Sequence, residues 1–97
     1  MPIITVIATV RAKAGCEEKA KKLLLELVEA THREEGCINY DLHQSIESKG
    51  EFVFHENWKS KDALDAHMNG ANLKSYREKL GPLLDGEPVI KRFAKIG

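Results

Sequence analysis

A chain of 97 residues fits a single domain, residues 1–97, whose modest core would gain stability from a partner subunit. Fifteen basic and fifteen acidic side chains cancel without a block of one sign, so the sequence lacks the electrostatic footprint of a nucleic-acid-binding or anionic-membrane-binding protein. The apolar N-terminus has no basic region and is interrupted by Arg11 and Lys13, well short of the ~20 residues that span a bilayer, so we expect a cytoplasmic protein with no membrane partner.

The first third of the chain predicts a strand followed by a long helix. Residues 3–13 are rich in Ile, Val and Thr and lead into Ala14-Gly15, as in a strand that ends at a turn. From Cys16 to Glu35 the apolar positions recur at helical spacing, so we predict an amphipathic helix stopped by Gly36. These positions are Ala20, Leu23, Leu24, Leu27, Val28 and Thr31.

The middle third predicts a hairpin. Residues 37–46 alternate apolar and polar positions, with Ile38, Tyr40 and Leu42 on one face. This alternation predicts a strand instead of a helix. Turn-forming residues 47–50 separate this strand from a second strand over residues 52–58.

Two short helices and a last strand complete the pattern. Ser60 is a predicted N-cap, and the inner positions of its helix are Ala63, Leu64, His67 and Met68. Gly70 breaks that helix. A second stripe of Leu73, Tyr76, Leu80 and Leu83 follows, which Gly81-Pro82 bends or ends. Residues 88–96 predict the final strand.

The resulting order, β-α-β-β-α-β, predicts an α+β, ferredoxin-like split βαβ fold with an antiparallel four-stranded sheet and helices on one face. Strand one carries Ile3 and Ile7 on one side and Ile4, Val6 and Val10 on the other. Both sheet faces therefore hold apolar area. We expect a second copy of the chain to cover the free face, sheet against sheet, and His55 and Asn57 to lie in that contact.

Three function classes find no support in the residues. The four histidines match no metal-ligand spacing, so we expect no metal. The sequence has no Gly-rich phosphate loop and no Ser-His-acid or Cys-His-acid signature. Cys16 and Cys37, without a secretory signal, predict free thiols with no catalytic role.

The segment from Phe52 to Leu84 holds the candidate site. It places Trp58, His67 and Tyr76 on consecutive elements that fold over one another, which is how an apolar pocket with a few polar groups is built. His67 is a candidate base, Trp58 a flat wall with one N–H donor, and Tyr76 a candidate donor. Each of them is equally compatible with ordinary packing or, for Tyr76, with a place at the edge of the stripe.

The hairpin strands add candidate substrate-binding residues. Glu56 shares a strand face with Phe54 and Trp58, and an inward carboxylate needs a partner. We expect that partner to be His67 or Arg92, unless Glu56 lies at the sheet margin. Tyr40 is a further candidate, although sheet packing also explains it.

Several motifs together resemble the antibiotic biosynthesis monooxygenase family, particularly its quinol monooxygenase-like members. The matching residues are Gly15, then Glu35-Gly36-Cys37-x-x-Tyr40-x-Leu42, then Glu56-x-Trp58-x-Ser60-x-x-Ala63-Leu64-x-x-His67. The resemblance covers essentially the whole chain. It implies a dimeric α+β barrel, a cavity between helices and sheet, and oxygenation of an electron-rich aromatic without metal or flavin.

Two other branches of the family share part of this pattern. Haem-degrading members hold haem with an Asn and a His at positions that are Ala8 and Arg77 here, so haem degradation is disfavoured. Members that isomerise a phosphorylated autoinducer share the Glu-Glu-Gly turn and the helix-borne His. Many relatives also carry a second His where this chain has Asn72, which can hydrogen-bond a substrate oxygen but cannot take up a proton near neutral pH.

The sequence therefore favours a cofactor-independent monooxygenase that uses molecular oxygen on a quinol or related small aromatic, with no cofactor. The alternatives are an isomerase of a small phosphorylated carbonyl compound and a non-catalytic binding dimer. A basic rim around the cavity mouth would favour the isomerase, and a cavity plugged by side chains would favour the non-catalytic protein.

Overall fold

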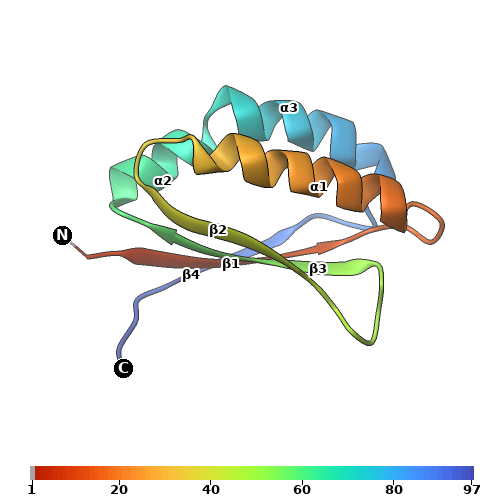
Figure 1. The fold of residues 1–97 in the computed structure, drawn as a ribbon, viewed down its shortest axis with the longest axis horizontal. Helices are drawn as coiled ribbons and strands as arrows, with labels where there is room; N and C mark the ends of the chain where they lie inside the picture. Colours follow the sequence, from red (N-terminus) through yellow and green to blue (C-terminus); the bar gives the residue numbers. More distant parts are fainter. Residues whose placement is uncertain (1) are drawn as a thin grey trace.

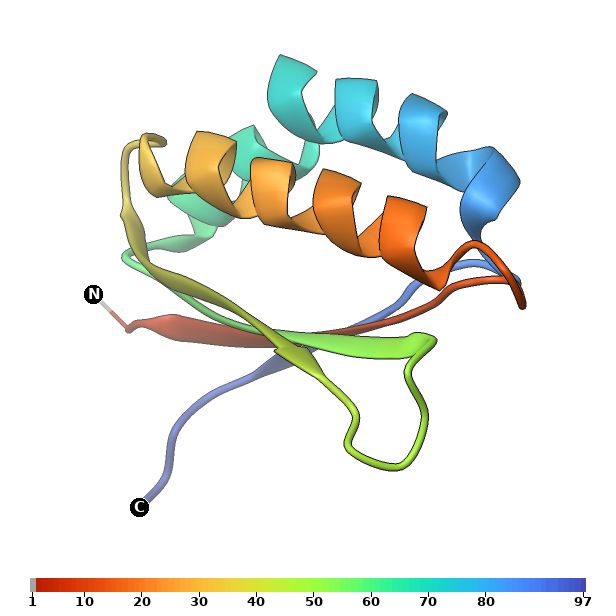
Figure 2. The same cartoon turned by 45° about the vertical axis from the view of Figure 1, so that its right-hand side comes forward.

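A computed structural model describes residues 2–97 and confirms the α+β architecture (Figures 1 and 2). Four antiparallel strands form one sheet in the order β2-β3-β1-β4. Three helices lie on one face of that sheet. In chain order the elements are β1 (Ile4–Arg11), α1 (Glu17–His32), β2 (Cys37–Gln44), β3 (Glu51–Trp58), α2 (Lys61–Met68), α3 (Ala71–Leu80), the 3₁₀ turn η1 (Gly81–Leu83) and β4 (Val89–Phe93).

The core lies between the sheet and the helices. On β1 the alternate residues Val6, Ala8 and Val10 are buried, and in β3 every second side chain from Phe52 to Trp58 is buried. Helix α1 supplies Leu24 and Leu27 from its inner stripe. Burial therefore alternates along the strands and follows one stripe of the helix, as the sequence pattern predicts.

The start of α2 follows the predicted capping chemistry. The Ser60 hydroxyl accepts a hydrogen bond from the Ala63 N–H at 3.1 Å, which satisfies one of the free donors at the helix start. Helix α3 begins after Gly70 and ends at Leu80, where Gly81 and Pro82 start the 3₁₀ turn. The predicted stripe from Leu73 to Leu83 is therefore divided between α3 and the 3₁₀ turn.

The predicted inward position of Ile38 is wrong. The register shifts between Cys37 and Asn39, so that Cys37 pairs with Trp58 and Asn39 with Asn57. Ile38 is the extra residue of this bulge and is 52% exposed. Because a bulge inserts one residue into the alternation, Cys37 takes the inner place that Ile38 would have held.

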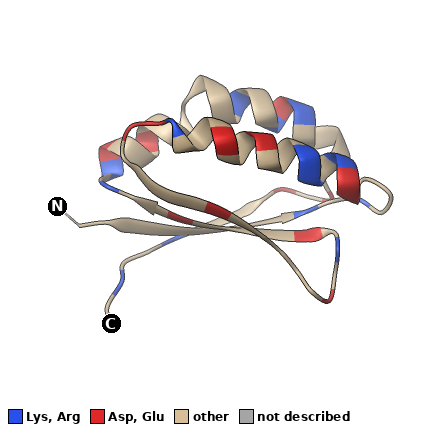
Figure 3. Cartoon of the chain, viewed as in Figure 1, with Lys and Arg blue, Asp and Glu red and all other residues tan. Residues whose placement is uncertain are grey.

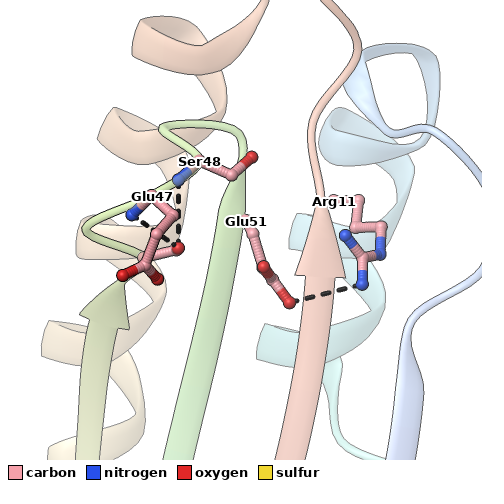
Figure 4. Close-up of polar contacts among 5 residues, drawn as sticks. Arg11, Glu47, Ser48 and Glu51 are labelled. Carbon is pink, nitrogen blue, oxygen red and sulfur yellow. Dashed lines mark hydrogen bonds and ion pairs between the residues drawn. The ribbon is translucent and has the colours of Figure 1, made fainter.

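The β2–β3 turn is held by local hydrogen bonds (Figure 4). The Ser45 hydroxyl accepts from the backbone N–H groups of Glu47 and Ser48 at 3.2 and 3.1 Å. At the start of β3, Arg11 pairs with Glu51 across the strands at 3.3 Å. These contacts hold the turn between the two strands in place.

No helix covers the second sheet face among residues 2–97 (Figure 1). His55 and Asn57 lie on this open face, since they pair with Ile7 and Thr5 of β1. A polar row crosses it: Thr5 donates to the Asn57 amide oxygen at 2.6 Å, and the Asn57 amide donates to Asn39 at 2.8 Å. Val89 and Phe93 of β4 add exposed apolar area.

Charged residues of both signs are interspersed along α1 and α3 (Figure 3). None of the helices in residues 2–97 is long and apolar enough to cross a membrane. The charge balance seen in the sequence is therefore also a spatial balance over the helical layer.

Candidate active site

A cavity of about 320 Å³ lies between the helical layer and the sheet. Its volume is at the lower end of the range of small-molecule sites, about 300–1,000 Å³. Apolar side chains form most of its wall: Ala8, Val10, Leu24, Leu27, Phe54, Met68, Leu73, Leu80, Leu84, Pro88 and Ile90. Three titratable groups on buried residues, Tyr40, Glu56 and His67, also line it.

His67 reaches the cavity from the inner face of α2 and is 3% exposed. Its Nδ1 lies 2.9 Å from Oε1 of Glu34. Burial lowers the pKa of His67 below its usual 6.5, and the Glu34 carboxylate partly offsets this shift. The imidazole is therefore mostly neutral at pH 7, the form that can accept a proton.

Glu34 comes from the turn between α1 and β2. Its second oxygen, Oε2, accepts a hydrogen bond from the Asn72 amide at 3.3 Å. Helix α1 ends at His32, earlier than the predicted Glu35, and this early end leaves Glu34 free to face α2. Glu34 thus links the α1–β2 turn, α2 and the start of α3.

Trp58 packs against His67 rather than facing the cavity. The two ring centroids are 4.6 Å apart and the planes are tilted by 30°. Trp58 is 0% exposed, at the end of β3. The sole indole therefore supports the imidazole from behind and does not form the cavity wall that the sequence predicted for it.

Glu56 hydrogen-bonds Trp58, not His67 or Arg92 as predicted. The indole N–H donates to Oε1 of Glu56 at 2.9 Å, while Arg92 lies 3.8 Å from Asp65. The register explains this, because Glu56 and Trp58 are two residues apart on the same strand face. Burial raises the pKa of Glu56 from its usual 4.5 to about 7, and the Trp58 hydrogen bond partly opposes that rise.

Tyr40 and Phe54 also take inner positions. Their ring centroids are 4.8 Å apart, and Tyr40 meets His67 edge-on at 5.4 Å. Burial, and then the nearby Glu56 charge, raise the pKa of Tyr40, so its hydroxyl stays protonated at neutral pH. Both residues line the cavity, where predicted substrate contact is geometrically possible.

Two predicted donors lie elsewhere. The Tyr76 hydroxyl lies 3.4 Å from the Glu26 carboxylate of α1, and Tyr76 is absent from the cavity wall. Asn72 is exposed and bonds Glu34. The fold therefore brings His67, Glu56, Tyr40 and Phe54 to the cavity, holds Trp58 behind them, and leaves Tyr76 and Asn72 outside.

The cavity mouth carries one charge of each sign. Arg77 and Glu87 are exposed and both line it. Ala8 and Arg77, the two positions compared with haem-degrading relatives, also face this space. A guanidinium cannot serve as an iron ligand. Arg77 therefore gives haem no axial ligand at this position, and haem degradation remains disfavoured.

Sequence reasoning missed Glu34 and gave Arg77 no role in the site. Glu34 lies 33 residues before His67, and only the Glu34-Glu35-Gly36 turn motif could have drawn attention to it. Arg77 lies four residues after Leu73 and therefore on the same side of α3. That spacing was a usable signal.

The two cysteines are free, and no metal site forms among the described residues. Cys16 and Cys37 are free thiols. Burial raises the pKa of Cys37 to about 11, so its thiol is unreactive at neutral pH. Among residues 2–97, no three His, Cys, Asp or Glu side chains gather as a metal site would require.

Fold and site together define a ferredoxin-like α+β domain that encloses an apolar cavity with a buried imidazole and carboxyl. The family model described as antibiotic biosynthesis monooxygenase matches residues 3–79. The chain belongs to the antibiotic biosynthesis monooxygenase family.

Relatives from distant organisms support this assignment. The protein named putative monooxygenase Rv0793 of Mycobacterium tuberculosis is 33% identical over 93 residues, which cover 96% of this chain and 91% of that protein. Its solved structure superimposes with a TM-score of 0.89 at 29% identity, covering 98% of this chain and 96% of that chain. The structure of PA3566 from Pseudomonas aeruginosa gives a TM-score of 0.92 at 29% identity, covering 100% and 97%.

Proposed function

We propose that this protein is a cofactor-independent monooxygenase that oxidises a quinol or a related electron-rich aromatic with molecular oxygen. Family membership supports an oxygenase, and a relative is named a putative monooxygenase. The observation that carries the proposal is a neutral imidazole, His67, in the wall of an apolar cavity. Such a site removes a hydroxyl proton and shields the resulting anion from water.

The reaction balances without an external reductant. His67 takes the proton of a quinol hydroxyl at Nε2, and the electron-rich anion passes electrons to oxygen. One oxygen atom replaces hydrogen at a ring carbon and the other leaves as water, so the quinol and O₂ become a hydroxyquinone and H₂O. The substrate supplies all four electrons. The protein supplies a base, a dry space and donors to the anion.

The cavity surroundings suit such a substrate. Phe54 and Tyr40 offer aromatic walls at one end, and the leucines of α1 and α3 offer an apolar sleeve along the rest. Glu56, with a pKa of about 7, is protonated in about half of the molecules at pH 7. In that form its hydroxyl donates to a substrate oxygen.

The alternatives receive less support. An isomerase of a phosphorylated compound needs a basic mouth, and the wall residues Arg77 and Glu87 give one charge of each sign. A purely structural protein would fill its core, and here about 320 Å³ stays open. We also propose that the protein works in the cytoplasm as a homodimer whose open sheet faces meet, because Val89 and Phe93 expose apolar area there.

The test is oxygen consumption with a panel of naphthoquinols and benzoquinols. His67→Ala should lower turnover at pH 7 by about 100-fold or more, the usual contribution of a general base. His43→Ala, an exposed position of β2, is the matched control and should keep full activity. Trp58→Ala should also lose activity, because it removes the support of the imidazole.

Circular dichroism of each variant separates lost chemistry from lost folding. If His67→Ala is folded and oxidises every quinol as fast as the parent protein, His67 has no part in the reaction and the proposal fails. If no quinol in the panel consumes oxygen, the substrate class is wrong.

A further inference from the structure

We infer that Glu34 is the positioning residue of the site: its carboxylate fixes the His67 imidazole with Nδ1 protonated and Nε2 unprotonated toward the cavity. The inference rests on the proposed function for its catalytic meaning. Its structural content, a Glu34–His67 dyad that sets the tautomer, can be tested without any substrate.

The hydrogen-bonding chemistry fixes the direction of the proton. An ionised carboxylate can only accept hydrogen bonds, so the 2.9 Å contact between Glu34 Oε1 and His67 Nδ1 requires a proton on Nδ1. In the neutral ring the lone pair then lies on Nε2. No side chain of residues 2–97 hydrogen-bonds Nε2, so this nitrogen is free for a ligand.

Glu34 is itself held in place. Its Oε2 accepts from the Asn72 amide at 3.3 Å, so each carboxylate oxygen has one partner. Its backbone N–H donates to the Thr31 carbonyl at 3.0 Å, and its carbonyl accepts from the Cys37 N–H at 3.3 Å. A carboxylate fixed from both sides orients its partner ring more strongly than a mobile surface group does.

The turn that carries Glu34 is packed directly onto α2. Gly36 has φ +83°, and a methyl group at this position would collide with the Ala63 side chain. The Gly36 carbonyl also accepts from the Lys59 N–H at 2.8 Å. Only glycine allows both the left-handed backbone and this close approach, so the Glu34-Glu35-Gly36 turn sits where Glu34 can reach His67.

The imidazole ring is also restrained by its aromatic neighbours. Trp58 stacks on it at 4.6 Å, and Tyr40 meets it edge-on at 5.4 Å. A ring flip would place carbon where Nδ1 now donates, and would leave the Glu34 oxygen without that donor. The neutral tautomer and the ring orientation are therefore set together.

The same contact stabilises the charge that catalysis creates. After proton uptake the imidazolium faces the Glu34 carboxylate, with side chains 2% and 22% exposed. The other groups around the ring are Arg77 of α3, which disfavours its charge, Tyr40 of β2, and Glu56 of β3, which lines the same cavity. Glu34 is the nearest negative partner and so determines how strong a base His67 is.

The test compares Glu34→Gln with Glu35→Gln, which removes the same charge one residue away on the exposed side of the turn. Nitrogen-15 NMR of labelled imidazoles should show His67 of the parent protein protonated at Nδ1 in its neutral form. In Glu34→Gln the His67 titration should move to lower pH and the Nδ1–H tautomer should lose its dominance. Glu35→Gln should leave both unchanged.

The kinetic arm uses whichever quinol the parent protein oxidises. Glu34→Gln should lower kcat/KM about tenfold, as loss of about 1.4 kcal/mol implies, and shift the acidic limb of its pH profile to lower pH. Asn72→Ala, which removes only the donor to Oε2, should lower kcat/KM less than Glu34→Gln does. A merely structural role for Glu34 would lower activity without moving the acidic limb.

Two outcomes overturn the inference: a parent protein whose neutral His67 is protonated at Nε2, or a Glu34→Gln variant with the parent's tautomer, titration and acidic limb. Failure of the proposed function looks different. In that case no quinol is oxidised, while the NMR measurement of the His67 tautomer still tests the Glu34–His67 contact.

Discussion

Glu56→Gln should change how the stability of this domain depends on pH. Glu56 is 3% exposed and its pKa is raised from 4.5 to about 7, chiefly by burial. Because the folded-state pKa lies above the unfolded one, its contribution to stability is fully present below about pH 4.5. That contribution is lost as the pH rises through about 7.

The size of the effect follows from the pKa change. A rise from 4.5 to about 7 corresponds to about 3 kcal/mol, at about 1.4 kcal/mol for each pKa unit. Glutamine keeps an acceptor for the Trp58 N–H but cannot ionise. The free energy of unfolding of Glu56→Gln, relative to the parent protein, should therefore increase by about 3 kcal/mol between about pH 4 and about pH 8.5.

Urea unfolding at a series of pH values measures this difference. Trp58 is the only tryptophan and donates directly to Glu56, so its fluorescence reports both unfolding and the ionisation of Glu56 in the folded protein. The fluorescence titration should have a midpoint near pH 7 in the parent protein and lose that component in Glu56→Gln. His67, whose pKa is lowered, destabilises the domain as the pH falls below about 6.5, equally in both proteins.

The matched control is Glu51→Gln, at the start of the same strand. The Glu51 carboxylate is partly exposed and pairs with Arg11 at 3.3 Å, so its removal should cost at most about 1 kcal/mol. A stability difference between Glu56→Gln and the parent that does not vary with pH would refute the burial argument. It would mean that Glu56 is ionised at no cost in the folded protein.

Three further predictions concern the turn, the open face and the cavity. Gly36→Ala should lower the free energy of unfolding, measured in urea, by at least about 2 kcal/mol, because the strained backbone and the collision with Ala63 add together. Gly15→Ala has a similar φ but open surroundings and should lower it by about 1 kcal/mol. Phe93→Glu should convert the proposed dimer to a monomer in sedimentation velocity. Ile46→Glu, in the exposed hairpin turn, should leave the dimer intact. A parent protein that is already monomeric contradicts the proposed assembly. Ala8→Leu should fill part of the cavity and weaken quinol binding at least tenfold in calorimetry while the domain stays folded, and unchanged binding would place the ligand elsewhere.

Much of the fold was predictable because periodicity is a local property. The burial alternation of β1 and β3 and the Ser60 cap follow from residues that are neighbours in sequence. Ile38 was misplaced because a bulge depends on the strand opposite, not on the strand that contains it. Alternation alone cannot show where the extra residue sits.

The site was only partly predictable for a related reason. His67 and Trp58 lie on adjoining elements, so their contact could be expected from chain order. The contact between Glu34 and His67 joins residues 33 apart and depends on the packing of a turn against α2. On α3 the sequence interpretation chose Tyr76 instead of Arg77, although Arg77 faces the cavity and Tyr76 faces Glu26 of α1.

Burial sets opposite protonation states for the two polar groups of the cavity. It lowers the pKa of His67 and raises that of Glu56, because a dry environment disfavours either charge. Near pH 7 the cavity therefore presents a neutral base and a carboxyl that is about half protonated. Pairs of groups whose pKa values are displaced in this way serve as base and acid in enzymes.

The two glutamates of the site differ in their exposure to water. Glu34 lies at the edge of the helical layer, where water and the Asn72 amide solvate its carboxylate. Glu56 lies inside and has the Trp58 N–H as its only hydrogen-bond donor among residues 2–97. Burial therefore disfavours the charged form of Glu56 inside the cavity, while the Glu34 carboxylate lies next to Nδ1 of His67, on the side away from the cavity. A base made stronger by the Glu34 carboxylate, in a mostly apolar space, is what proton removal from a weakly acidic hydroxyl requires.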